Sequence, residues 1–157
     1  AGVNYHFVDK AEFEKMIDDD AFLEYASVFG NYYGTSKAAV AEPLADGRDV
    51  LLEIDWQGAA LVRQAHPEAV SIFIVPPSLD ARRERLQGRA QDDPEVIESR
   101  LAEAKTEMAH YDEFDYLVVN DHFAVALEEL RAIVLAERCR VRTRAARNST
   151  LMKALLA

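Results

Sequence analysis

The sequence is short of cysteine, of positive charge and of long apolar runs, and each shortage excludes a class of protein. Cys139 is the only cysteine, so the chain forms no internal disulfide and offers no thiolate metal cluster. The four histidines lack the spacing of a structural zinc site. No apolar run approaches the roughly 18 residues of a membrane span, and residues 1–10 do not have the composition of a signal peptide. We therefore expect a cytoplasmic protein without membrane contact.

Acidic residues outnumber basic ones by 28 to 18, which gives a formal net charge of −10 at pH 7 and a pI near 4.8. This balance argues against binding to nucleic acid or to an anionic membrane as the main function. The charge is uneven, because six basic residues and no acidic ones follow Glu137. Residues 1–137 contain 12 basic and 28 acidic residues, a formal charge of −16. We expect so acidic a body to bind anions through a few placed arginines, and the basic C-terminal segment to pack on an acidic neighbour, as in a homo-oligomer.

The 157 residues are enough for one domain with a core, and half of them are apolar. From residue 49 onward, apolar runs typical of buried strands alternate with helical patterns, which predicts an α/β three-layer fold with a parallel sheet. The predicted strands of this part are 49–54, 69–75 and 116–119, and the predicted helices are 56–65, 78–87, one beginning at Pro94 and one beginning at Phe123. The aromatic first 35 residues predict a separate β-rich lobe, with strands at 5–8 and 22–29 and a helix capped by Asp9. Ser36 is predicted to cap a further short helix that ends near Asp46-Gly47.

The segment GNYYGTS, residues 30–36, is the densest candidate for chemistry. Its two glycines predict a turn with a strand on each side. Two tyrosine hydroxyls and two aliphatic hydroxyls on such a turn can donate to phosphate oxygens without adding charge. The same composition also fits an ordinary hairpin with half-buried tyrosines, and composition alone leaves both interpretations open.

A second candidate is Glu53-Ile54-Asp55-Trp56-Gln57-Gly58, at the predicted end of a buried strand. Ligands of open α/β sheets bind outside the carboxyl ends of the strands. Because side chains alternate along a strand, Glu53 and Asp55 point to the same side. Either these acids contact a metal or ligand, or Asp55 only caps the helix that follows, and the spacing does not decide between the two.

A third candidate is a concentration of arginines around Gly88, made up of Arg82, Arg83, Arg85, Arg89 and Arg100. Mobile arginines beside a glycine suit phosphoryl transfer, because they stabilise charge on the moving group and can swing inward when a site closes. The ordinary alternative is a solvated helix face.

Taken in order, these segments resemble guanylate kinase. The family's pattern is matched over nearly the whole chain by NYHFV, AFLEYASVFGNYYGTS, LEIDWQG, IFIVPPS, RLQGRAQDDPEVIESRL and YLVVND. The resemblance implies a P-loop-kinase-like three-layer α/β fold with a parallel sheet core, a small β-rich GMP-binding lobe and a helical lid. It also implies one domain over residues 1–157, with the lobe at 1–36, the core at 37–77 and 106–157, and the lid region at 78–105.

The resemblance further implies roles for individual residues in ATP-dependent phosphorylation of GMP, with Mg²⁺. Tyr5 and Tyr33 match tyrosines that hold the GMP phosphate. Glu24, Thr35 and Asp55 match residues that read the guanine, whose N1–H and amino group suit acceptor carboxylates. The remaining matches are the lid arginines Arg85, Arg89 and Arg100, which close over the ATP phosphates, Asn120 beside the adenine, and Glu53 at the position linked to the magnesium shell.

The sequence also departs from the family pattern. Glu53 stands where family members usually have Asp, and Ala90 replaces the usual glycine after a lid arginine. The family's phosphate-binding loop, G-x-x-x-x-G-K-[ST], does not occur, because none of the six glycines precedes a lysine. The loop and the family's Thr-Thr-Arg stretch belong upstream of Tyr5. We therefore expect the chain to be the C-terminal three-quarters of a guanylate kinase that lacks turnover by itself.

An alternative from another class is a non-catalytic guanylate-kinase-like binding module that recognises phosphorylated peptides. The presence of Glu24, Thr35 and Asp55 favours the kinase, because a peptide binder has no need to select guanine.

Overall fold

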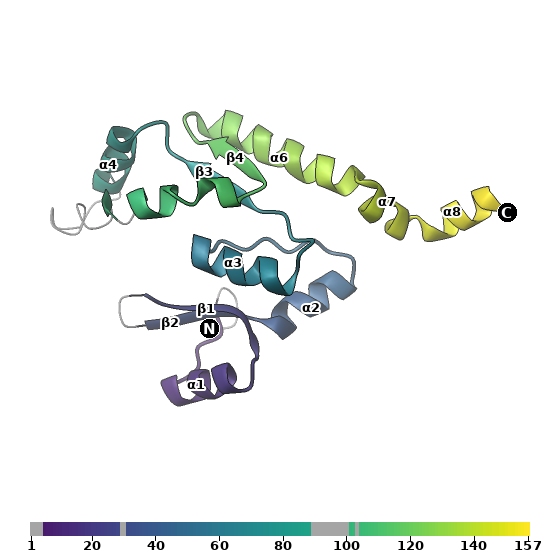
Figure 1. Ribbon diagram of the computed structural model, residues 1–157, viewed down its shortest axis with the longest axis horizontal. Coiled ribbons are helices and arrows are strands. Elements are labelled where there is room, and N and C mark those ends of the chain that lie inside the picture. Colours follow the sequence, from purple (N-terminus) through teal and green to yellow (C-terminus); the bar gives the residue numbers. More distant parts are fainter. Residues whose placement is uncertain (1–4, 29–30, 89–100, 103) are drawn as a thin grey trace. The chain divides into compact units, whose positions relative to one another are not determined.

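The computed structural model describes residues 5–28, 31–88, 101–102 and 104–157 (Figure 1). The chain divides into two compact units, residues 1–69 and 70–157. The predicted division into lobe, core and lid uses other boundaries and stays a prediction. In the described part of the chain, no helix is both long and apolar enough to cross a membrane.

The first unit is built on a two-stranded antiparallel hairpin of β1 (Phe22–Val28) and β2 (Asn31–Ser36). Its helices are α1 (Lys10–Asp18), α2 (Lys37–Ala45) and α3 (Trp56–Ala65). Each helix begins at a residue whose side chain accepts a hydrogen bond from a backbone N–H three residues on, namely Asp9, Ser36 and Asp55. These caps satisfy N–H groups that have no partner inside the helix, and the predicted starts of all three helices are confirmed.

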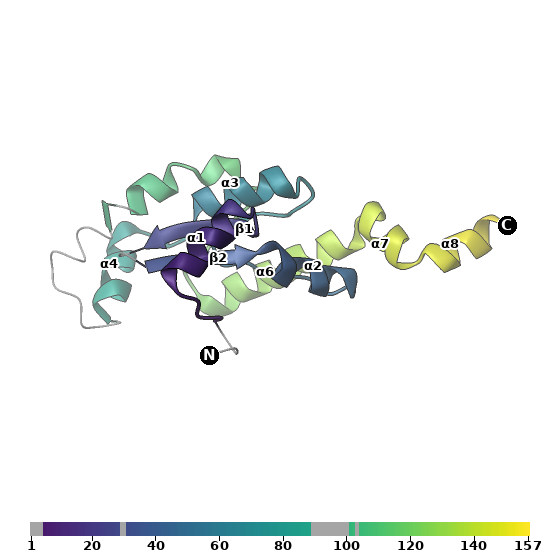
Figure 2. The same ribbon diagram turned by 90° about the horizontal axis from the view of Figure 1, so that it is seen from below.

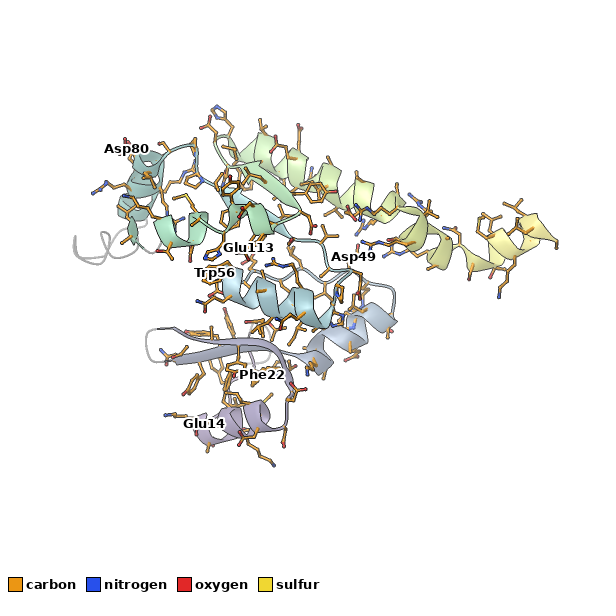
Figure 3. The ribbon with its side chains drawn as sticks, in the orientation of Figure 1. Glu14, Phe22, Asp49, Trp56, Asp80 and Glu113 are labelled. Atoms are coloured by element: carbon orange, nitrogen blue, oxygen red, sulfur yellow. The ribbon has the colours of Figure 1, made fainter. Side chains whose placement is uncertain are left out.

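Apolar packing joins these elements. Leu23, Val40 and Val62 are buried together, and apolar side chains of residues 50–54 pack against them. On the other part of the hairpin, Phe13 of α1 stacks on Phe22 and Tyr32, with ring centroids 4.4 and 5.2 Å apart (Figure 3). These contacts hold β1 between α1 and α3.

Two predicted strands of this unit are wrong, and a predicted turn is a strand. Residues 5–8 and 49–54 are irregular, whereas the tyrosines predicted to lie on a turn belong to β2. A strand needs a neighbouring backbone to complete its hydrogen-bonded ladder, and among the described residues none pairs with 49–54. The alternation still has its packing consequence: Val50, Leu52 and Ile54 face the core, while Leu51 is 83% exposed.

The second unit contains a parallel pair of short strands, β3 (Ile72–Val75) and β4 (Tyr116–Val119), in the register Ile72↔Tyr116 to Val75↔Val119. Its other elements are α4 (Leu79–Gly88), the 3₁₀ turn η1 (Tyr111–Glu113), α6 (Phe123–Cys139), α7 (Val141–Arg147) and α8 (Ser149–Leu156). Residues 101–102 and 104–108 are also helical. Val118 is almost completely buried. The parallel pairing of two of the three predicted core strands is confirmed.

Ser78 and Asp115 stabilise the ends of these elements. The Ser78 hydroxyl accepts a hydrogen bond from the Ala81 N–H, which caps α4 as predicted. The carboxylate of Asp115 accepts from both the backbone N–H and the hydroxyl of Ser71, so that the two strands start together. α7 and α8 then continue beyond the C-terminal end of α6 (Figures 1 and 2).

Candidate functional site

A buried carboxylate lies at the centre of the hairpin in the first unit. Glu24 is directly opposite Thr35 in the β1–β2 register, and the Thr35 hydroxyl donates to Glu24 Oε1 over 2.5 Å. Only 8% of Glu24 is exposed, and it is the one buried charged residue in the part of the chain that the structure describes. A buried carboxylate is costly unless hydrogen bonds satisfy its oxygens. The Thr35 hydroxyl provides a hydrogen bond for Oε1, and the surroundings of Oε2 are described below.

A second carboxylate lies at the start of α3, which packs on β1. Asp55 Oδ1 accepts a hydrogen bond of 2.7 Å from the Gly58 N–H. Among the described residues no donor contacts Asp55 Oδ2, and the residue is exposed. The cap therefore uses one oxygen and leaves the other accessible. Figure 3 labels Trp56, which marks this end of α3.

The two carboxylates converge on Gly58. A Cβ atom placed on this glycine would lie 3.3 Å from Glu24 Oε2 and 3.3 Å from Asp55 Oδ1. Two acidic groups thus flank the first turn of α3, where the partial positive charge of the helix N-terminus offsets part of their mutual repulsion. Paired acceptors of this kind can receive two parallel N–H donors from a planar heterocycle.

Tyr5 and Tyr33 come together in the same unit, although the chain between them forms α1, β1 and part of β2. Their ring centroids are 6.3 Å apart with an edge-to-face angle of 70°. The residues are 60% and 45% exposed. Two adjacent exposed phenols offer two O–H donors without a positive charge, which is the arrangement predicted for holding a phosphate.

Glu53 and Asp55 are both exposed, whereas Ile54 between them is partly buried. The structure does not surround Glu53 with further ligands: among the described residues, no group of three or more His, Cys, Asp or Glu side chains is arranged to hold a metal ion. Mg²⁺ usually keeps several waters and binds through one or two carboxylates together with substrate phosphates. A single exposed carboxylate is compatible with that coordination.

In the second unit, Arg85 of α4 is hydrogen-bonded to the loop after β4. Its guanidinium donates to the backbone oxygens of Asn120, over 2.8 Å, and of Asp121, over 3.2 Å. Two of the predicted ATP-side residues, Arg85 and Asn120, are therefore in contact. Arg82 forms an ion pair of 3.8 Å with Glu107. The other predicted lid arginines, Arg89 and Arg100, and the departure at Ala90 lie outside the described residues.

The structure gives two glycines of these motifs a packing role that the sequence did not predict. A Cβ on Gly34 would come within 2.8 Å of the Phe22 ring, so Gly34 is needed for close strand contact rather than for a turn. Gly58 leaves space for the two carboxylates, as described above. The signal available in the sequence was the position of each glycine beside a candidate residue, Thr35 in one case and the Asp55 motif in the other.

Comparison with known proteins identifies the family of the chain. The family model for guanylate kinase matches residues 1–137. The chain belongs to the guanylate kinase family. A guanylate kinase of Methylococcus capsulatus is 57% identical over 155 residues, which cover 99% of this chain and 76% of that protein. A guanylate kinase of Escherichia coli K12 is 54% identical over 156 residues, covering 99% and 75%.

A solved structure supports the fold. The crystal structure of guanylate kinase from Anaplasma phagocytophilum superposes with a TM-score of 0.73 at 33% sequence identity, covering 89% of this chain and 68% of that one. Membership of the guanylate kinase family confirms the resemblance predicted from the motifs, together with the α/β kinase fold class.

Proposed function

We propose that this chain serves the ATP-dependent phosphorylation of GMP to GDP, and that its first unit binds the GMP. The observation that carries the proposal is the convergence of the Glu24 and Asp55 carboxylates at the start of α3. Guanine presents N1–H and an amino group side by side, whereas adenine has an acceptor at N1. Two acceptor carboxylates therefore select guanine and leave adenine unpaired.

In this proposal each residue of the first unit has a separate part. Glu24 and Asp55 accept from the guanine edge, and the Thr35 hydroxyl contacts the base while it holds Glu24 in place. Tyr5 and Tyr33 donate to the GMP phosphate. Because the tyrosines are neutral, they orient the phosphate without lowering its nucleophilicity as much as cations would.

The ATP side of the reaction would draw on the second unit. Arg85, Arg89 and Arg100 are proposed to neutralise the ATP phosphates, and Asn120 to lie beside the adenine. Mg²⁺, when bound with ATP, supplies charge neutralisation at the phosphate oxygens, and Glu53 is the proposed carboxylate for its shell. Arg85 now donates to backbone oxygens, so this role requires it to exchange those acceptors for phosphate. ATP and GMP as substrates, and the lone cysteine, support a cytoplasmic location.

Calorimetry with GMP and AMP tests the GMP site on the 157-residue chain. Binding to GMP is expected to be at least about 100-fold tighter than to AMP, because AMP offers no N–H donor at N1 and leaves the buried Glu24 and the exposed Asp55 unpaired. The control variant is Glu24→Gln, which keeps the size of the side chain and is expected to remove most of the preference. Equal binding of the two nucleotides, or binding of neither, contradicts the proposal and favours the alternative of a module that binds phosphorylated peptides.

We also propose that copies of the chain associate through the C-terminal arm, residues 138–157. The arm carries six basic residues and no acidic ones, whereas residues 1–137 carry a formal charge of −16. Val141, Leu155 and Leu156 of the arm are 70–82% exposed. An apolar surface with a positive rim fits the acidic surface of a second copy better than it fits water.

Sedimentation of the full chain at low and high salt tests the association. We expect a mass above that of one chain at low salt, decreasing as ionic strength rises. The double substitution Arg142→Glu with Arg147→Glu should give a monomer at both ionic strengths. A single-chain mass at all concentrations and salt levels would exclude the proposal, including the case in which the arm folds back on its own chain.

A further inference from the structure

Gly58 lies where the two carboxylates of the candidate guanine site come closest to the backbone of α3. It is buried in the first turn of the helix, and its N–H donates to Asp55 Oδ1 over 2.7 Å. Glu24 Oε2 lies beside the Cα of Gly58, 3.3 Å from the position that a Cβ would take. Gly58 thus affects both acids: its N–H donates to Asp55, and its lack of a side chain leaves room for the Glu24 carboxylate.

Glu24 is held from the opposite direction by the hairpin. Thr35 donates to Oε1, so the carboxylate is fixed between the Thr35 hydroxyl and the surface of α3. Most contacts between real Cβ atoms and their neighbours are longer than 3.3 Å, and Ile54 Cβ would lie at the same distance. A methyl group on residue 58 would therefore displace the Glu24 carboxylate by a few tenths of an ångström, or push α3 away from β1.

We propose that Gly58 is a specificity-determining positioning residue, which sets the distance between the Glu24 and Asp55 carboxylates so that both reach the guanine edge at once. This inference rests on the proposed GMP site. Two parallel hydrogen bonds to one rigid ring require both acceptors to be placed within about half an ångström. Glycine meets this requirement at residue 58 because any other residue type has a Cβ, which would keep the Glu24 carboxylate away from the helix backbone.

The substitution Gly58→Ala separates positioning from stability. Alanine favours helix formation over glycine, but a methyl group here would crowd the packing of α3 on β1. A purely structural role therefore predicts a changed melting temperature with an unchanged ratio of GMP to IMP affinity. Positioning predicts weaker GMP binding by about tenfold, in line with the effect of small displacements in preorganised sites. It also predicts a smaller preference for GMP over IMP, which lacks the amino group and makes only one of the two bonds. Gln64→Ala, at an exposed position near the C-terminal end of α3, is the matched control and should leave both quantities unchanged.

A double-mutant cycle with Glu24→Asp tests the route of the effect. Aspartate is one methylene shorter and withdraws its carboxylate from residue 58. In the Glu24→Asp background, Gly58→Ala should therefore change GMP affinity by less than twofold, although it costs about tenfold in the wild-type chain. An equal loss in both backgrounds overturns the inference, because the methyl group would then act on something other than Glu24.

The remaining outcomes are equally decisive. If Glu24→Gln leaves GMP binding unchanged, the proposed GMP site itself fails. If Glu24→Gln weakens binding while Gly58→Ala binds GMP and IMP as the wild type does, only the inference about Gly58 fails. If crowding prevents Gly58→Ala from folding, the variant that also carries Glu24→Asp should fold, as judged by circular dichroism, and a failure of both to fold contradicts the inference.

Discussion

The Thr35 hydroxyl donates a hydrogen bond to the Glu24 carboxylate across the β1–β2 hairpin, with 2.5 Å between the two oxygens. The two residues are opposite one another in the strand register, so the hairpin itself brings them together. Only 8% of Glu24 is exposed, so its carboxylate oxygens need hydrogen-bond donors in a fixed geometry. The same bond that makes the burial tolerable also orients the carboxylate, which links the stability of the hairpin to the binding of a ligand.

Thr35→Val removes the hydroxyl and keeps the shape of the side chain. We expect the free energy of unfolding to fall by about 1–3 kcal/mol, because one oxygen of a buried carboxylate loses its donor. GMP affinity should fall by about tenfold, since Glu24 is then free to rotate. Chemical denaturation and calorimetry measure the two effects. Thr35→Ser keeps a hydroxyl at the same place and should retain most of the stability and most of the GMP affinity. If the serine variant is as impaired as the valine variant, packing of the threonine methyl group matters instead of the hydroxyl.

Asp55→Asn and Asp55→Ala separate the helix cap from the ligand contact, a question that the spacing of the motif leaves open. Asparagine is a good N-cap, so the asparagine variant should unfold like the wild type, whereas the alanine variant should lose about 1 kcal/mol of stability. Both should bind GMP at least tenfold more weakly, because both lose the acceptor carboxylate. Wild-type GMP binding by Asp55→Asn would show that Asp55 is a cap and nothing more.

Tyr33→Phe and Tyr5→Phe test the contact to phosphate. Each removes one O–H donor and leaves the ring contact between the two residues intact. A hydrogen bond to a charged group contributes about 1.5–3 kcal/mol, so each variant should bind GMP about tenfold or more weakly. Guanosine has no phosphate and serves as the control ligand, with affinity expected to stay within twofold. A similar loss for GMP and guanosine argues for a role of the hydroxyls in folding of the lobe.

Tyr116 is expected to make stability depend on alkaline pH. Its hydroxyl donates to Glu137 over 2.7 Å, and this hydrogen bond, with burial and the negative charge of Glu137, raises the pKa of the Tyr116 phenol above its ordinary value. Because the folded-state pKa is the higher one, the stabilisation is fully present below roughly pH 10 and is lost as pH rises through the folded-state pKa. The melting temperature of the wild type should therefore fall more steeply above roughly pH 10 than that of Tyr116→Phe.

Ultraviolet titration of the tyrosines provides the control for that prediction. The chain has six tyrosines, and one of them should ionise later than the rest in the wild type. The late transition should be absent in Tyr116→Phe and should move toward the others in Glu137→Gln. Identical titration curves for wild type and Tyr116→Phe would contradict the assignment.

Local sequence predicted the starts of helices well. Asp9, Ser36 and Ser78 were each expected to cap a helix, and Asp55 was one of two open alternatives before the helix predicted from Trp56; all four side chains accept from the backbone three residues on. An N-cap depends on groups within one turn, so the residues that make it are all present in a short stretch of chain. Predictions that depended on distant partners succeeded less often. Residues 49–54 have the composition of a buried strand, yet they are irregular because no described neighbour completes a ladder with them.

The same division applies to the candidate site. The order of residues specifies the chemistry that is available: the acids, the hydroxyls and the phenols and, through the motifs, the family. Folding is needed to bury Glu24 against Thr35, to bring Tyr5 into contact with Tyr33, and to place Gly58 between Glu24 and Asp55. These contacts join residues from different elements, and a shift of one residue in the β1–β2 register would turn Glu24 to the opposite face of the hairpin. Residue types specify which interactions are available, whereas strand register and helix packing specify which of them are made.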